Sequence, residues 1–184
     1  MSVFIALLSA VNVGGRKAPS ADLKRLCLEI GWKRAETLLA SGNIIIDAGR
    51  ASAKSVSLKL EAAIKEAFGF EATCITRTAD DLDAVLTRLP YKTYEPKLMI
   101  VTFLSDAPTK AAIAALDAFN QGREDYVIDG AEMFIRYESG VADTKLTPPV
   151  IKRKLGVVGT GRNVNTVGKL RDKAREMEGA KKLT

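Results

Sequence analysis

The sequence predicts a mixed α+β protein, because strand-like and helix-like patterns alternate in the same order twice along the chain. The apolar runs VFIALLSA and KLMIVTFL each precede an amphipathic helical pattern, and a pair of short β-rich runs around a turn follows each pattern. Strand, helix and hairpin in this order are typical of the βαββαβ, or ferredoxin-like, unit. We therefore predict two ferredoxin-like halves with a helical C-terminus.

The first half is predicted to span residues 1–77. A helix is expected from Ser20, as its N-cap, to Gly31, and a hairpin is expected on either side of Ser41-Gly42. A second helix follows, and the run ATCITR completes the unit as its fourth strand. The apolar face of that second helix is formed by Val56, Leu60, Ile64 and Phe68.

A helical connector is predicted over residues 78–96. Thr78 and Asp81 have the spacing of a capping box at its start, and Pro90 closes it. Asp80, Asp81 and Asp83 are explained by this helix N-terminus, where the macrodipole favours carboxylates, rather than by a metal site.

The second half is predicted over residues 97–140. It has the strand KLMIVTFL, a helix from Pro108, and a hairpin of DYVID and EMFIRY around an Asp-Gly step. Residues 141–184 are predicted to form a basic helical C-terminal segment. In it, one helix ends at Gly156, VVGTGRN forms a loop, and a last helix follows, so the second half is expected to end in helices where its fourth strand would be.

The composition excludes several classes of chemistry. The 184 residues include no histidine, which removes Ser-His-Asp catalysis, Cys-His catalysis and histidine-ligated metal sites. Cys27 and Cys74 have no metal-binding or CxxC spacing and are interpreted as small core residues. We expect no metal and no cofactor. The first apolar run is too short to span a bilayer and lacks a preceding positive charge, so we predict a cytoplasmic protein that does not enter the membrane.

The net charge of +6 is concentrated at the C-terminus. From Lys145 onward there are eleven Lys and Arg against three Asp and Glu, whereas the rest of the chain has a balance of −2. The last helix carries its cations in rows beside an apolar stripe. We interpret these rows either as a solvated face or as a surface that attracts nucleic acid or another polyanion. The cations are Lys169, Arg171, Lys173 and Arg175.

The stretch VNVGGRKAPS follows the first strand and is the first candidate site. With the strand order 4-1-3-2 of a ferredoxin-like unit, the loop after strand 1 and the turn after strand 2 lie at the same edge. Glycine backbone, two cations and a helix N-terminus would there suit a phosphate or a carboxylate. The alternative is that these are only turn residues and solvated cations. The residues concerned are Asn12, Gly14, Gly15, Arg16 and Lys17, together with Ser41, Gly42 and Asn43.

A second candidate precedes the last helix in GVVGTGRN. This segment lacks the ending of a phosphate-binding P-loop, but it places Gly159, Gly161 and Arg162 where the last helix begins. Arg162 is expected to contact an anion or to form a structural salt bridge, and Asn163 is a suitable N-cap.

Three blocks together resemble a known family: FIALLSAVNVGGRK, LLASGNIII and GTGRNVNTVGKL. The sequence is similar to the bacterial family called domain of unknown function 1697, over essentially the whole chain. The resemblance implies two ferredoxin-like subdomains and no established activity, so it assigns no catalytic residue. Ser9 and Val164 depart from the family, which usually has an arginine and an aromatic residue there. The recurrent family positions are Asn12, Gly14, Gly15, Ser41, Gly42, Asn43, Arg162, Asn163 and Thr166.

These observations predict a non-enzymatic binder of an anionic, phosphate-bearing ligand or of nucleic acid. One alternative is a histidine-independent enzyme acting on a small anionic metabolite. In it, Ser41, Asn43 and Arg162 would polarise the substrate and Lys17 or a tyrosine would move protons. Another alternative is an oligomeric interaction module that uses a sheet edge or the apolar stripe of the last helix. The sequence leaves the oligomeric state open.

Overall fold

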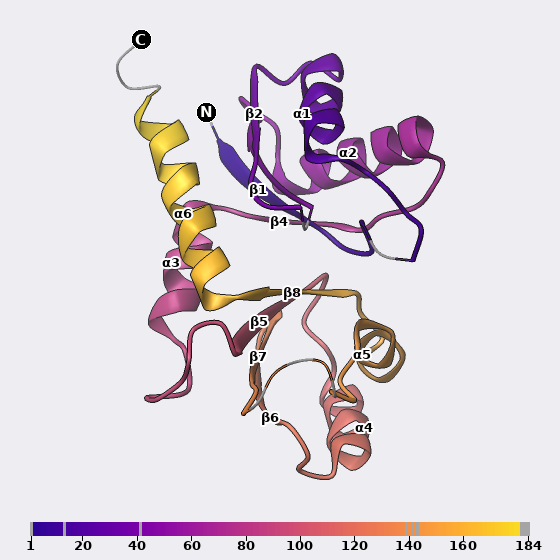
Figure 1. The fold of residues 1–184 in the computed structure, drawn as a ribbon, viewed down its shortest axis with the longest axis vertical. Helices are drawn as coiled ribbons and strands as arrows, with labels where there is room; N and C mark the ends of the chain where they lie inside the picture. The colour runs from indigo at the N-terminus through magenta and orange to yellow at the C-terminus, as the bar shows by residue number, and fades with distance from the viewer. Residues whose placement is uncertain are drawn as a thin grey trace. The chain divides into compact units, whose positions relative to one another are not determined.

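The computed structural model describes residues 2–12, 14–40, 42–138, 140, 142 and 144–180 (Figure 1). The chain forms two compact units, Met1–Ala84 with Gly168–Thr184, and Val85–Val167. The fold is α+β with two ferredoxin-like halves, each built on a four-stranded antiparallel sheet. No helix in the described ranges is both long and apolar enough to cross a membrane.

The first unit has the predicted strand order, since its sheet runs β2-β3-β1-β4. Phe4, Ala6 and Leu8 alternate along β1 and face the core beneath α1 and α2, which lie on one side of this sheet (Figure 1). Leu23 of α1 and Leu60 of α2 are buried in the same core. The elements are β1 (Val3–Leu8), α1 (Ser20–Glu29), β2 (Arg34–Thr37), β3 (Asn43–Asp47), α2 (Ala53–Phe68) and β4 (Cys74–Arg77).

Two further helices contribute to the first unit, α3 (Ala79–Thr87) and α6 (Val164–Gly179), and the division between the units falls within each of them. Leu170, Ala174 and Met177 of α6 are buried at helical spacing, as the sequence predicts. The Thr78–Asp81 capping box at the start of α3 is confirmed. The Asp81 carboxylate accepts from the Thr78 backbone N–H at 2.7 Å, and the Thr78 hydroxyl accepts from the Asp81 backbone N–H at 3.1 Å.

The second unit has the strand order β6-β7-β5-β8. Leu104 and Met133 of its sheet share a core with Leu116 of α4 and Ile151 of α5. The hairpin predicted around Asp129-Gly130 is confirmed by the pairing of β6 with β7. The elements are β5 (Met99–Leu104), α4 (Lys110–Asn120), β6 (Asp125–Asp129), β7 (Glu132–Arg136), α5 (Pro148–Leu155) and β8 (Gly159–Asn163).

The segment predicted as the loop VVGTGRN is instead largely the fourth strand of the second sheet. β8 pairs antiparallel with β5 from Ile100↔Asn163 to Leu104↔Gly159. The expectation that this half ends in helices after residue 140 is therefore wrong. The glycines of this segment indicated a loop, but in the structure they allow β8 to pack closely against the side chains of β5. A Cβ at Gly159 would lie 2.8 Å from Thr102 Cγ2, and one at Gly161 would lie 3.0 Å from Ile100 Cγ2.

The predicted boundaries change accordingly. The connector 78–96 and the C-terminal segment 141–184 are each divided between the two units, after Ala84 and before Gly168. Two helix starts also differ from the prediction. Pro19, not Ser20, is the N-cap of α1, and α4 begins after Thr109, whose hydroxyl accepts from the Ala112 N–H at 3.2 Å. A start at Pro108 would lack this bond.

Candidate functional site

The loop between β1 and α1 is bonded to the turn between β2 and β3, as the strand order predicts. The Asn12 side chain makes this connection. Its Nδ2 donates to the carbonyl of Ala40 at 2.7 Å and to that of Ala18 at 3.2 Å, and its Oδ1 accepts from the Ala18 N–H at 2.9 Å. Asn12 therefore holds the loop and the turn together, and we call its three hydrogen bonds the Asn12 clamp. We call the surface around it the rim, formed by residues 12 and 14–17 of the loop and 38–40 and 42 of the turn; of these, Leu38 is half-buried and Gly42 is buried.

The rim gathers backbone in the left-handed region. Among the described residues, only four other than glycine have positive φ. Asn12 at 59° and Leu39 at 62° belong to the rim, and Ala10 at 56° precedes it by two positions. Gly14 and Gly15 follow with φ of 57° and 83°. Such conformations cost free energy for any residue with a Cβ and persist only when surrounding contacts impose them. The sequence indicated this for the glycines, but nothing in LLASGN indicated it for Leu39.

Gly42 and Asn43 hold the turn side of the rim. A Cβ at Gly42 would lie 2.9 Å from Leu8 Cβ, so the turn can approach β1 only with glycine at this position. Asn43 is 1% exposed, and its Nδ2 donates to the Leu38 carbonyl at 2.8 Å. Its side-chain amide therefore stabilises the β2–β3 hairpin. Ser41, which the sequence also placed here, lies outside the described residues.

The charged part of the rim is Arg16 and Lys17, both exposed, like Gly14 and Gly15 beside them. The chain then enters α1, whose N-cap Pro19 makes no side-chain capping bond. The Ser20 hydroxyl instead donates to the Leu39 carbonyl at 3.3 Å, which ties the start of α1 to the turn. Asp22 in the first turn of α1 is the one opposing charge there, and it pairs with Arg25 at 3.1 Å.

Arg162 and Asn163 belong to the second unit and lie in β8, not in a loop. Arg162 is 7% exposed, and its Nη1 donates to Thr160 Oγ1 and to the Gly161 carbonyl, both at 2.8 Å. Burial lowers the pKa of its guanidinium to about 10. The Asn163 Oδ1 accepts from the Thr166 N–H at 2.9 Å, which confirms it as a cap for α6. Both side chains thus make structural bonds within their own segment.

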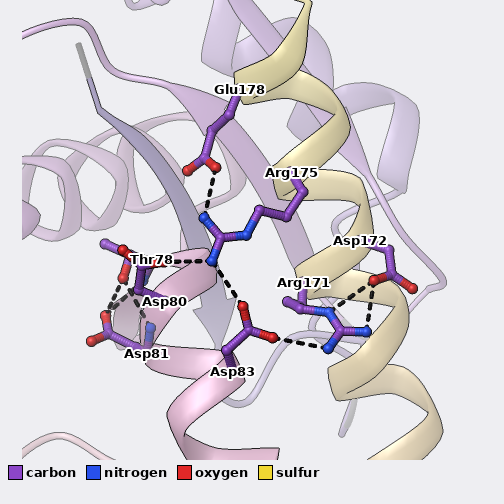
Figure 2. Close-up of polar contacts among 8 residues, drawn as sticks. All are labelled: Thr78, Asp80, Asp81, Asp83, Arg171, Asp172, Arg175 and Glu178. Carbon is purple, nitrogen blue, oxygen red and sulfur yellow. Dashed lines mark hydrogen bonds and ion pairs between the residues drawn. The ribbon is translucent and has the colours of Figure 1, made fainter.

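The cations of α6 make ion pairs, mainly with α3 (Figure 2). Arg171 Nη1 lies 2.9 Å from Asp83 Oδ1, and Arg175 Nη2 lies 2.8 Å from Asp83 Oδ2. Arg175 also bonds Asp80. The cations that the sequence placed in rows beside the apolar stripe thus have carboxylate partners within the chain, while their side chains stay partly exposed. These pairs also give Asp80 and Asp83 a partner that the helix-terminus explanation missed, because residues about ninety positions apart do not form a sequence motif.

The remaining α6 cation with contacts is Lys173, whose Nζ lies 2.8 Å from Glu176 and 3.9 Å from Glu36 of β2. All of these side chains are partly exposed, so each pair adds little to stability by itself. Together they position α6 along α3 and leave its cations less able to attract another anion.

Few described residues have the environment of a reactive group. Burial raises the pKa of Cys27 and of Cys74 to about 12, so both thiols stay protonated near neutral pH. No cluster of three or more His, Cys, Asp or Glu within the described ranges is arranged to hold a metal. The rim offers backbone N–H groups and two cations, a combination suited to holding an anion.

Comparison with known proteins bears on the family and the fold. Residues 1–134 match the model of the family described as Protein of unknown function (DUF1697). The chain belongs to this family. The matched region includes the rim but ends before GTGRNVNTVGKL, the third block on which the resemblance rests. No curated protein matches the sequence.

A solved structure of a conserved bacterial protein from Streptococcus pneumoniae has the same fold. The TM-score is 0.70 at 19% identity, and the match covers 95% of this chain and 99% of that one. At this identity the similarity establishes the shared architecture and carries no information on function.

Proposed function

We propose that this DUF1697 protein binds a small phosphate-bearing ligand at the rim without acting on it chemically. The observation that carries the proposal is the Asn12 clamp, because it fixes a glycine-containing loop beside two exposed cations. Successive backbone N–H groups in such a loop form a concave surface that suits an anion. Arg16 adds a planar fork for phosphate oxygens, and Lys17 adds a mobile point charge.

Two features favour a small ligand over nucleic acid. Three of the four α6 cations are engaged with carboxylates of the chain itself, so the basic C-terminal helix adds little to a polyanion surface. The cations at the rim are two adjacent residues, enough for one or two phosphate groups. A nucleic acid would need a longer row of cations.

Binding is favoured over catalysis because the side chains suited to polarising a substrate make structural bonds. Asn43 is committed to the Leu38 carbonyl, and Arg162 is buried against its own strand. The proposal therefore rests on Gly14, Gly15, Arg16 and Lys17, held by Asn12.

The test is calorimetric titration of the protein with inorganic phosphate and pyrophosphate. Arg16→Ala/Lys17→Ala should weaken binding at least tenfold and leave thermal stability unchanged, since both side chains are exposed. The matched control is Lys33→Ala/Arg50→Ala. It removes the same two charges at the opposite end of the same sheet, beside Arg34↔Asp47. Equal weakening in both variants would indicate only nonspecific charge attraction, and no binding by the wild type would reject the proposal.

A further inference from the structure

Leu39 stands out in the rim because neither backbone preference nor packing accounts for it. Its φ of 62° lies in the left-handed region, which disfavours a residue with a bulky side chain. The residue is also 54% exposed, so it recovers little of that cost by burial in the protein. Glycine or asparagine would fit the same turn with less strain.

The conformation of Leu39 is imposed from both sides. Its carbonyl accepts from the Ser20 hydroxyl at 3.3 Å, and the next carbonyl, that of Ala40, accepts from Asn12 at 2.7 Å. The apolar side chain of Leu39 therefore projects from backbone that is hydrogen-bonded to Ser20 at the start of α1 and to Asn12 of the cationic loop. A strained residue fixed in this way is typical of a contact surface.

We infer that the ligand of the rim is an organic phosphate whose apolar group packs on Leu39 while its phosphate contacts the loop carrying Arg16 and Lys17. This inference rests on the proposed function and specifies its ligand class. An apolar group that covers the exposed half of a leucine side chain gains about fivefold in affinity over phosphate alone, from the usual value of burying such a side chain. Inorganic phosphate can use only the charged half of the site.

The probes are inorganic phosphate, n-butyl phosphate, phenyl phosphate and AMP, each titrated by calorimetry at pH 8, where all are largely dianions. The wild type should bind at least one of the three esters about fivefold or more tightly than inorganic phosphate. A preference for AMP indicates a nucleotide, whereas a preference for the butyl or phenyl ester indicates a simpler apolar group. Either result supports the inference.

Three variants locate the effect. Leu39→Gly should remove the preference for esters, keep the affinity for inorganic phosphate, and raise Tm by relieving the positive φ. Leu39→Ala should remove the same preference without that gain in Tm. Comparing the two variants distinguishes the loss of the side chain from the added backbone flexibility of glycine. Leu58→Ala alters a leucine of α2 that is 57% exposed and should leave every affinity unchanged.

The outcomes separate the two proposals. If the wild type binds inorganic phosphate at the rim but no ester more tightly, or if Leu39→Gly keeps the preference, the inference about Leu39 is wrong and the proposed function stands. If the wild type binds none of the four probes, the proposed function fails and the inference fails with it.

Discussion

The side-chain amide of Asn12 donates to the carbonyl oxygen of Ala40 at 2.7 Å, joining the β1–α1 loop to the β2–β3 turn. The two segments are separated by a helix and a strand in the sequence, yet one side chain holds them together. Together with its bonds to Ala18, this side chain ties the two ends of the glycine-containing loop to each other and to the turn. The loop and the turn should therefore depend on Asn12 for both stability and binding.

Replacing Asn12 with alanine is expected to lower the free energy of unfolding by about 2 kcal/mol. The change removes three hydrogen bonds, each worth roughly 1 kcal/mol or less at a partly exposed site, and places a Cβ-bearing residue without a local bond at positive φ. Asn12→Gly should cost less, because glycine tolerates the conformation. Urea unfolding measures both. Wild-type stability in Asn12→Ala would show that the clamp contributes nothing.

Gly42→Ala is expected to destabilise the protein by about 3 kcal/mol. The new Cβ would lie 2.9 Å from Leu8 Cβ, an atom fixed to the backbone of β1, and the residue would also carry a φ of 69°. Gly49→Ala is the matched control, since its φ is 62° and nothing lies within 4 Å of its Cβ position. It should show only the backbone cost of about 1 kcal/mol. Equal losses in thermal unfolding would refute the close approach of Gly42 to β1.

The pairs between α3 and α6 predict a loss of stability in acid. Hydrogen bonds from Arg175 and then Arg171 hold the pKa of Asp83 below its ordinary value of 3.8. The pKa of Asp83 is lower in the folded state than in the unfolded state. The stabilisation from its ion pairs is therefore complete above pH 3.8 and disappears as the pH falls through the folded-state pKa. Asp83→Asn should therefore flatten the dependence of stability on pH below about 4.

Glu66→Gln is the control for that experiment, because it removes an exposed carboxylate from α2 of the same unit. Chemical unfolding between pH 2 and pH 7 gives the comparison. Identical pH profiles for Asp83→Asn and the wild type would mean that the ion pairs in Figure 2 do not contribute in solution.

Both cysteines are predicted to be unreactive in the native protein. Burial raises the pKa of Cys27 and Cys74 to about 12, so only about one thiol in ten thousand is ionised at pH 8. Labelling with a thiol-specific disulfide reagent should be much slower than in urea-unfolded protein. A native labelling rate equal to the unfolded rate would place at least one thiol at the surface.

The sequence predicts the first sheet well because its signals are local. The continuous apolar run of β1, the turn at Gly42 and the helical face from Val56 to Phe68 each lie within one short window. The confirmed strand order then follows from the βαββαβ pattern. The approach of the two candidate loops in this unit was predictable for the same reason.

The fourth strand of the second sheet was not predictable in this way. Gly159 and Gly161 lack side chains because Thr102 and Ile100 occupy the space, a condition that exists only once β5 lies beside β8. Long-range contacts also determine the environment of the C-terminal cations, since Arg175 forms ion pairs with Asp80 and Asp83 of α3. Likewise, Leu39 became a candidate only through its backbone conformation and exposure.

An amide ¹H–¹⁵N NMR titration of the full chain with inorganic phosphate observes binding at the rim directly. Binding at the rim predicts saturating shifts concentrated at the amides of Gly14, Gly15, Arg16 and Lys17, and their loss in Arg16→Ala/Lys17→Ala. Shifts that do not saturate, or that fall on α6 or elsewhere while the amides of the loop stay still, would contradict an anion site at the Asn12 clamp.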